Sequence, residues 1–184
     1  GEAMSIGRNF REALQKGIRS LEIGRYGLGS DKKDRWHIDH KFTEEEKEFI
    51  VRKITIPDDE RIFYIRYAIL AGFSISEIYK RSAVDPWFLY NIKQIIDVEK
   101  ELYKYNLNTL PSELLTKAKR SGFSDRQLAF IFGCDEKSIR EMRNKKNITA
   151  VFKVVDSVAG EFQAEKPYYY STFEKIDVVP STNK

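Results

Sequence analysis

Over most of this 184-residue chain, apolar residues recur three and four positions apart. That spacing places them on one face of an α-helix, because a helical turn takes 3.6 residues. Clear stripes begin at Phe10, Ile62 and Leu89. The pattern predicts helices at residues 9–23, 43–55, 58–71, 75–82, 86–105, 111–121, 125–132 and 136–145. We therefore expect an all-α fold, an irregular helical bundle of about eight helices.

Helix-start signals support these boundaries. Four segments have the spacing of a capping box. In a capping box the side chain of the first residue accepts from the backbone N–H of the residue three positions later, and the side chain of that later residue accepts from the backbone N–H of the first. They begin at Asn9, Thr43, Ser74 and Ser124. Asp85 followed by Pro86 gives a further start. Gly72 and Gly122 follow periodic segments, where a left-handed helix cap is expected.

The remaining stretches lack helical periodicity. Residues 24–42 read as a polar loop with glycines, in which Asp31 and Asp34 would be loosely held. The chain after Asn147 reads as irregular, with at most a short strand near 151–155. The run from Tyr168 to Tyr170 fits neither a helix stripe nor a strand alternation, so we expect it to expose aromatic surface.

A weak internal repeat with a spacing of fifty residues links two of the predicted helix pairs. GFSISEIYKRSAVDPWFLYNI, from Gly72, matches GFSDRQLAFIFGCDEKSIREM, from Gly122. Each copy reads as a short helix, a tight turn and a second helix. The match is sparse, but it indicates one supersecondary unit used twice.

The basic residues in and around the second copy suggest nucleic-acid binding as a separate role for it. The formal net charge is +4, and residues 111–147 alone hold nine Lys and Arg against five Asp and Glu. A turn glycine, Gly133, precedes a helix with the basic residues Lys137, Arg140, Arg143, Lys145 and Lys146. That is the layout of a DNA-binding helix-turn-helix. The acidic residues Asp135, Glu136 and Glu141 on the same helix would repel phosphate, so a helix pair that serves only packing is the other interpretation.

Candidate chemistry is sparse. His37 and His40 flank Asp39 but lack further ligands, so we interpret them as surface histidines rather than a metal site. Cys134, the one cysteine, reads as a small apolar filler in a turn and fits a reducing compartment. We find no phosphate-binding loop, nucleophile elbow, acid–base carboxylate pair, signal peptide or membrane span. These patterns favour a helical interaction module without catalytic residues.

Both ends of the sequence carry a specific resemblance. GEAMSIGRNFREALQKGIRSLE, from Gly1 to Glu22, resembles the segment that closes the first ATP-grasp half of the carbamoyl-phosphate synthase large subunit, departing from it mainly at Ala3. KPYYYSTFE resembles the family's Tyr-x-Tyr-Ser-Thr-Tyr-Glu segment, with Phe173 in place of the last tyrosine. Further matches follow in the same order over essentially all 184 residues.

This resemblance implies the oligomerization-domain fold that lies between two ATP-grasp units. Residues 1–24 would be the tail of the first (carboxyphosphate) unit, 25–160 the helical oligomerization domain, and 161–184 a linker toward the second (carbamoyl phosphate) unit. The parent ligase would make carbamoyl phosphate from bicarbonate, glutamine-derived ammonia and two ATP, for arginine and pyrimidine biosynthesis. Its ATP, with Mg²⁺ or Mn²⁺, would bind in domains outside this chain. The resemblance thus implies no catalytic, cofactor or metal residue here.

The resemblance also implies contacts. Met4 and Arg8 would lie near the first active site and the internal passage for intermediates, and Tyr168, Tyr170 and Phe173 would form an inter-domain seam. Expected partners are the rest of the large subunit (both ATP-grasp units and the allosteric domain), the small glutamine amidotransferase subunit, and a further copy through self-association. We expect a cytoplasmic protein without a membrane or nucleic-acid partner. A helix-turn-helix nucleic-acid-binding module is the alternative function.

Overall fold

The computed structural model describes residues 2–155 and 168–174. In this part of the chain it has eight helices and one two-stranded sheet, at α1 Phe10–Ser20, α2 Glu44–Thr55, α3 Arg61–Leu70, α4 Ile75–Ser82, α5 Pro86–Leu102, α6 Ser112–Arg120, α7 Asp125–Phe132, α8 Glu136–Lys145, β1 Val151–Val154 and β2 Tyr169–Thr172. Every predicted helix is present, with its ends within three residues of the expected ones. The all-α class is confirmed, with a short hairpin added.

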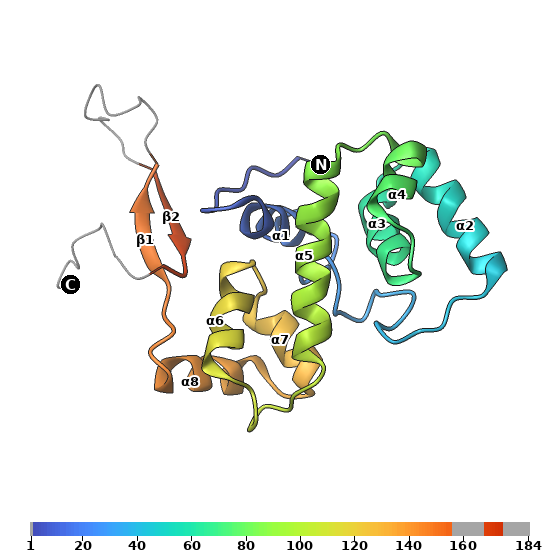
Figure 1. Cartoon of the computed structure of the whole chain (residues 1–184). Coiled ribbons are helices and arrows are strands. Elements are labelled where there is room, and N and C mark those ends of the chain that lie inside the picture. The colour runs from blue at the N-terminus through green and yellow to red at the C-terminus, as the bar shows by residue number, and fades with distance from the viewer. Residues whose placement is uncertain (1, 156–167, 175–184) are drawn as a thin grey trace.

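Helix α5 is the axis of the molecule. Figure 1 shows α2, α3 and α4 on one side of it and α1, α6, α7, α8 and the hairpin on the other. Helices α1, α3, α4 and α6 all pack directly against it. Its stripe of Leu89, Ile92 and Ile96 is completely buried, as the periodicity predicts.

The internal repeat is present in the backbone. Helices α4 and α7 have the same length and begin fifty residues apart, and the turns that follow them both contain a left-handed residue, at Ala83 and Gly133. The matched positions Ile78 and Leu128, and Leu89 and Ile139, are all fully buried. The repeat therefore reflects one packing unit used twice.

Two of the four predicted capping boxes close and two do not. Thr43 and Ser74 exchange both hydrogen bonds with the glutamates three residues on. Asn9 and Ser124 accept from the backbone as expected, but Glu12 and Gln127 do not reach back. Their side chains point into the protein, because each has a buried partner distant in the sequence.

The loop of residues 24–42 is ordered by buried charge, which corrects the expectation that its aspartates are loosely held. Asp31 is 2% exposed. Arg25 pairs with Asp31 at 3.1 Å and with Asp34 at 2.6 Å. Asp31 and Asp34 also accept hydrogen bonds from loop backbone N–H groups. The two carboxylates therefore stabilise the backbone conformation of the loop.

A second arginine anchors this loop to the helices. Arg66 of α3 is 1% exposed, and its guanidinium donates two hydrogen bonds to Glu99 of α5, at 2.6 and 3.1 Å. Asp34 lies 3.4 Å away, and Ser30 donates to the same glutamate. The buried charge cluster of Arg25, Asp31, Asp34, Arg66 and Glu99 thus joins the loop, α3 and α5.

Two glycines let the loop pass through the interior. A Cβ at Gly29 would lie 2.3 Å from the guanidinium carbon of Arg66, and one at Gly27 would lie 2.5 Å from the Gln15 carboxamide oxygen. A larger residue at either position would force these buried side chains to shift. Gln15 accepts from the Leu28 backbone at 3.1 Å, so α1 also holds the loop.

Removing the negative charge of Glu99 tests how far the fold depends on this cluster. We expect Glu99→Gln to lower the free energy of unfolding by about 3–5 kcal/mol, because a buried guanidinium loses its main partner. Glu101→Gln, at a partly exposed position of α5 whose carboxylate lies 3.6 Å from Lys117, is the matched control and should change stability by less than about 0.5 kcal/mol. Urea unfolding measures both. Equal effects in the two variants would contradict a dominant role for the cluster.

The repeat supplies a second test at its two cap glycines. Gly72 and Gly122 both have left-handed backbones, with φ of 92° and 87°. A Cβ at Gly72 meets no atom within 4 Å, whereas one at Gly122 would lie 2.9 Å from the Glu12 Cα. We expect Gly72→Ala to cost about 1 kcal/mol through its backbone conformation alone.

Gly122→Ala should cost at least about 1 kcal/mol more, because the backbone of α1 must also move. Thermal or urea unfolding of the two variants gives the difference. A larger loss at Gly72 would show that α1 is not held closely against the second copy.

Candidate interaction surfaces

The structure groups no side chains for metal binding or nucleophilic chemistry among the residues it describes. No set of three His, Cys, Asp or Glu residues there could hold a metal ion. His37 pairs with the exposed Asp39, and His40 pairs with Glu46 at 2.9 Å beside the ring of Trp36. Burial, and next the charge of Asp135, raise the pKa of the Cys134 thiol, which favours its protonated form.

Three basic residues of helix α8 lie within 4 Å of carboxylates of the same chain. Arg143 donates two hydrogen bonds to Asp125, at 2.7 and 2.9 Å, and Lys119 lies 2.9 Å from the same carboxylate. Burial lowers the pKa of Lys119 to about 8. On the exposed side, Lys137 and Arg140 face glutamates of their own helix. The arrangement favours the packing interpretation of this helix pair over DNA binding.

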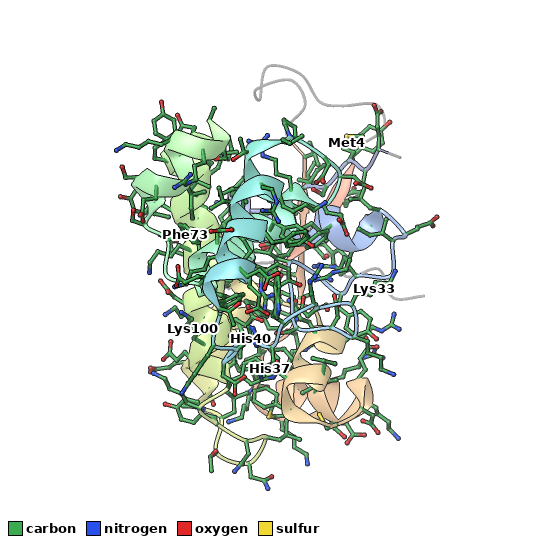
Figure 2. All side chains as sticks on the ribbon, turned by 90° about the vertical axis from the view of Figure 1, so that its right-hand side faces the viewer. Met4, Lys33, His37, His40, Phe73 and Lys100 are labelled. Carbon is green, nitrogen blue, oxygen red and sulfur yellow. The ribbon has the colours of Figure 1, made fainter. Side chains whose placement is uncertain are left out.

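The N-terminal segment, residues 4–8, lies against α1. Ser5 donates to the backbone oxygen of Ala13 at 2.8 Å, and a Cβ at Gly7 would lie 2.8 Å from the Ala13 nitrogen. Met4 is 91% exposed. Figure 2 shows it at the upper edge of the molecule, away from His37 and His40. The contacts of Ser5 and Gly7 with α1 thus hold the segment in place, and the Met4 side chain lies exposed at its start.

The tyrosine run forms strand β2, which corrects the expectation of an irregular strip. β2 pairs antiparallel with β1, with Val151 opposite Thr172 and Val154 opposite Tyr169. Tyr168 and Tyr169 are exposed, whereas Tyr170 is half-buried under the ammonium group of Lys16. Burial alternates along β1, whereas in β2 it increases from the exposed Tyr169 to the buried Thr172.

Phe173, directly after β2, packs on the second copy of the repeat. The ammonium group of Lys119 lies 4.7 Å from its ring centroid and the guanidinium of Arg143 lies 5.3 Å away. Arg120 donates to its backbone oxygen at 3.0 Å. Of the five basic residues in the helix-turn-helix pattern, Arg143 therefore contacts the end of the hairpin, together with Lys119 and Arg120 of α6.

The predicted site residues Arg8 and Phe173 come together through a residue that the sequence did not single out. Glu174 pairs with Arg8 at 3.1 Å and with Lys153 of β1 at 3.0 Å. Hydrogen bonds from Lys153 and Arg8 hold the pKa of Glu174 below its ordinary value. Met4 is 91% exposed, so the structure joins only part of the predicted set.

Two further residues of α1 were also missed. Glu12 is 2% exposed and accepts from the buried Thr172 hydroxyl at 2.9 Å. Lys16 pairs with Glu12 and donates to the backbone oxygens of Ile6 and Ser171. Nothing in the sequence indicates that these two residues contact β2. Glu12 has the spacing of a capping residue, and Lys16 reads as a solvent-facing lysine.

A strip of exposed and half-buried apolar side chains lies beside the N-terminal segment. We call Phe10, Leu21, Ile62, Trp87 and Phe88 the apolar strip. The Phe10 ring lies 5.3 Å from Trp87 and 5.2 Å from Phe88, centroid to centroid. Trp87 is 56% exposed, and open grooves flank Phe10 on both sides. Contiguous exposed apolar surface of this kind is typical of a protein contact.

Comparison with known proteins gives consistent matches. A family model described as the carbamoyl-phosphate synthetase large chain, oligomerisation domain, matches residues 2–147. A carbamoyl phosphate synthase large chain from Archaeoglobus fulgidus is 48% identical over 178 residues, which are 95% of this chain and 16% of that protein. The large chain from Rhodopirellula baltica is 43% identical over 182 residues, 98% of this chain and 16% of the relative.

A shorter relative covers the same region. The large chain, N-terminal section, from Aquifex aeolicus is 42% identical over 175 residues, 95% of this chain and 29% of that protein. The chain spans about a sixth of the longer relatives and less than a third of the shorter one. None of the helices in the described part combines the length and the apolar character that a membrane span requires.

Proposed function

Because the chain belongs to the oligomerisation-domain family of the carbamoyl-phosphate synthetase large chain, we propose that it is the helical scaffold between the two synthetase units of such a large chain. The family match over residues 2–147 carries this proposal, since it covers all eight helices of the described structure. The parent would be an ATP-dependent carbon–nitrogen ligase. It would make carbamoyl phosphate from bicarbonate, glutamine-derived ammonia and two ATP, for arginine and pyrimidine biosynthesis.

The chain by itself should be inactive under this proposal. Both ATP-grasp units, and with them the sites for ATP and Mg²⁺ or Mn²⁺, would lie elsewhere in the parent. The role of residues 25–160 would be mechanical, with 1–24 belonging to the first unit and 161–184 leading to the second. The boundary at 160/161 and the end at 175–184 lie outside the described residues.

The proposed contacts follow from the exposed segments. Met4 and Arg8 would lie beside the first active site and the passage for intermediates, and the exposure of Met4 leaves it available for that contact. Tyr168, Tyr170 and Phe173 would form the seam with the synthetase units. We also propose that the first unit covers the apolar strip, because the strip adjoins the segment that would belong to that unit.

Further partners are part of the same proposal. They are the allosteric domain, the small glutamine amidotransferase subunit and a second copy of the large chain. A cytoplasmic location fits a chain with one cysteine, since reducing compartments disfavour disulfides.

Covering of the apolar strip can be tested with the two tryptophans of this chain. Trp87 is 56% exposed and Trp36 is 8% exposed, so Trp36 is the internal control. In hydroxyl-radical footprinting we expect Trp87 to be oxidised at least about tenfold more slowly in the parent protein than in the 184-residue chain, because burial excludes the radical. Trp36 should react slowly in both. Equal Trp87 rates would show that the synthetase unit does not cover the strip.

Assembly and nucleic-acid binding are separated by two measurements on the chain. Light scattering across a concentration series should show an increase in mean mass, as self-association requires. A gel shift with duplex DNA at two salt concentrations should show no salt-steep binding. A strict monomer at high concentration would argue against self-association, and tight binding that weakens steeply with salt would support the helix-turn-helix function instead.

A further inference from the structure

Contacts between the first and last described segments are concentrated around one lysine. Lys16 of α1 donates to the Ile6 backbone oxygen at 2.9 Å and also to the Ser171 backbone oxygen. It pairs with Glu12 at 3.1 Å. Two hydrogen bonds and one ion pair of this single ammonium group thus join the N-terminal segment, α1 and β2.

A buried hydrogen bond lies beneath this lysine. The Thr172 hydroxyl donates to Glu12 at 2.9 Å, and the two residues are 1% and 2% exposed. A buried carboxylate that loses its partners is costly, so Glu12 favours only positions of β2 that keep Thr172 in place. This contact fixes the strand at its inner face.

At the edge of the hairpin, Glu174 completes the connection. It holds Arg8 at 3.1 Å and Lys153 of β1 at 3.0 Å. This carboxylate, two residues past β2, therefore links Arg8, the last residue of the N-terminal segment, to β1. The close approach of Gly7 to α1 leaves this segment little freedom to move without disturbing these contacts.

We infer that Lys16 and Glu174 are positioning residues of a clamp between the N-terminal segment and β2. Because of this clamp, a displacement of the N-terminal segment displaces β2, and a displacement of β2 displaces the N-terminal segment. The clamp consists of residues 5–8, Glu12, Lys16, Lys153 and residues 171–174. Coupling of this kind is reciprocal, so a disturbance on either side is felt on the other.

The consequence for catalysis rests on the proposed function. If residues 1–24 belong to the first synthetase unit and β2 leads toward the second, the clamp is a direct link between the two units within this domain. It would keep Met4 and Arg8 at a fixed position relative to the second unit. An intermediate that leaves the first site would then reach the second site and would not be lost to water.

The first test disturbs the N-terminal segment and reads the strand. In Gly7→Ala, the new Cβ would lie 2.8 Å from the Ala13 nitrogen, which moves residues 5–8 away from α1. We expect amides of residues 168–174 to exchange with deuterium about tenfold faster than in the wild-type chain. Peptides from α2 to α4 should be unchanged. Faster exchange everywhere, or none in β2, would overturn the clamp.

The second test disturbs the strand and reads the N-terminal segment. Thr172→Val keeps the shape of the side chain and removes the hydroxyl that Glu12 accepts from. Trypsin cleavage after Arg8 should then be about tenfold faster, because Arg8 is released from Glu174. Lys93→Met, which removes an exposed lysine paired with Asp97 on α5, is the control for both tests and should behave as wild type. Unchanged cleavage in Thr172→Val would contradict the coupling.

The third test uses the parent protein. Lys16→Met removes all three donors and keeps the apolar stem. We expect the ATP consumed per carbamoyl phosphate formed to rise about twofold or more, with Lys93→Met unchanged. An unchanged ratio would overturn the catalytic consequence. A wild-type parent that forms no carbamoyl phosphate would contradict the proposed function instead, and the exchange and cleavage results would still decide the clamp.

Discussion

The burial of Arg66 is the constraint on which the rest of the structure depends. A guanidinium in the interior requires carboxylates around it, and Glu99 and Asp34 supply them. Burial alone would lower the pKa of Arg66, but the charges of Glu99 and Asp34 outweigh it and hold that pKa above its ordinary value. The crossing of α3 and α5, the path of the loop and the glycine at position 29 all follow from this one arrangement.

The helices were predictable because their causes are local. Apolar spacing, capping residues and cap glycines lie within a few positions of the ends they determine. The order of residues 24–42 was not predictable, since Asp34 and Arg66 are far apart in the sequence and meet only in the tertiary structure. Strand β2 was missed for the same reason. Its residues pair with β1 residues 15 to 21 positions earlier, and its inner face is defined by Glu12, at the other end of the chain.

The candidate site shows the same division. The resemblance pointed to Met4, Arg8, Tyr168, Tyr170 and Phe173, which are distinctive in the sequence. The residues that connect these segments in space, Glu12, Lys16 and Glu174, look ordinary in the sequence. Glu12 even has a good local explanation as a capping residue. Its actual partner, Thr172, is 160 positions away, so only the tertiary structure could identify it.

Helix α1 explains why two copies of one backbone unit have different surfaces. Its side chains Asn9, Gln15 and Arg19 donate to the carbonyl oxygens of residues 120–122, which end α6 and would otherwise lack helical partners. The equivalent end of α3 in the first copy has no such cover at Gly72. The second copy therefore contacts α1 and the hairpin. The cations beside it, Lys119 and Arg143, contact Asp125 and Phe173. The first copy keeps Trp87 and Phe88 exposed at the start of α5, so it retains the apolar surface that another part of an assembly can bind.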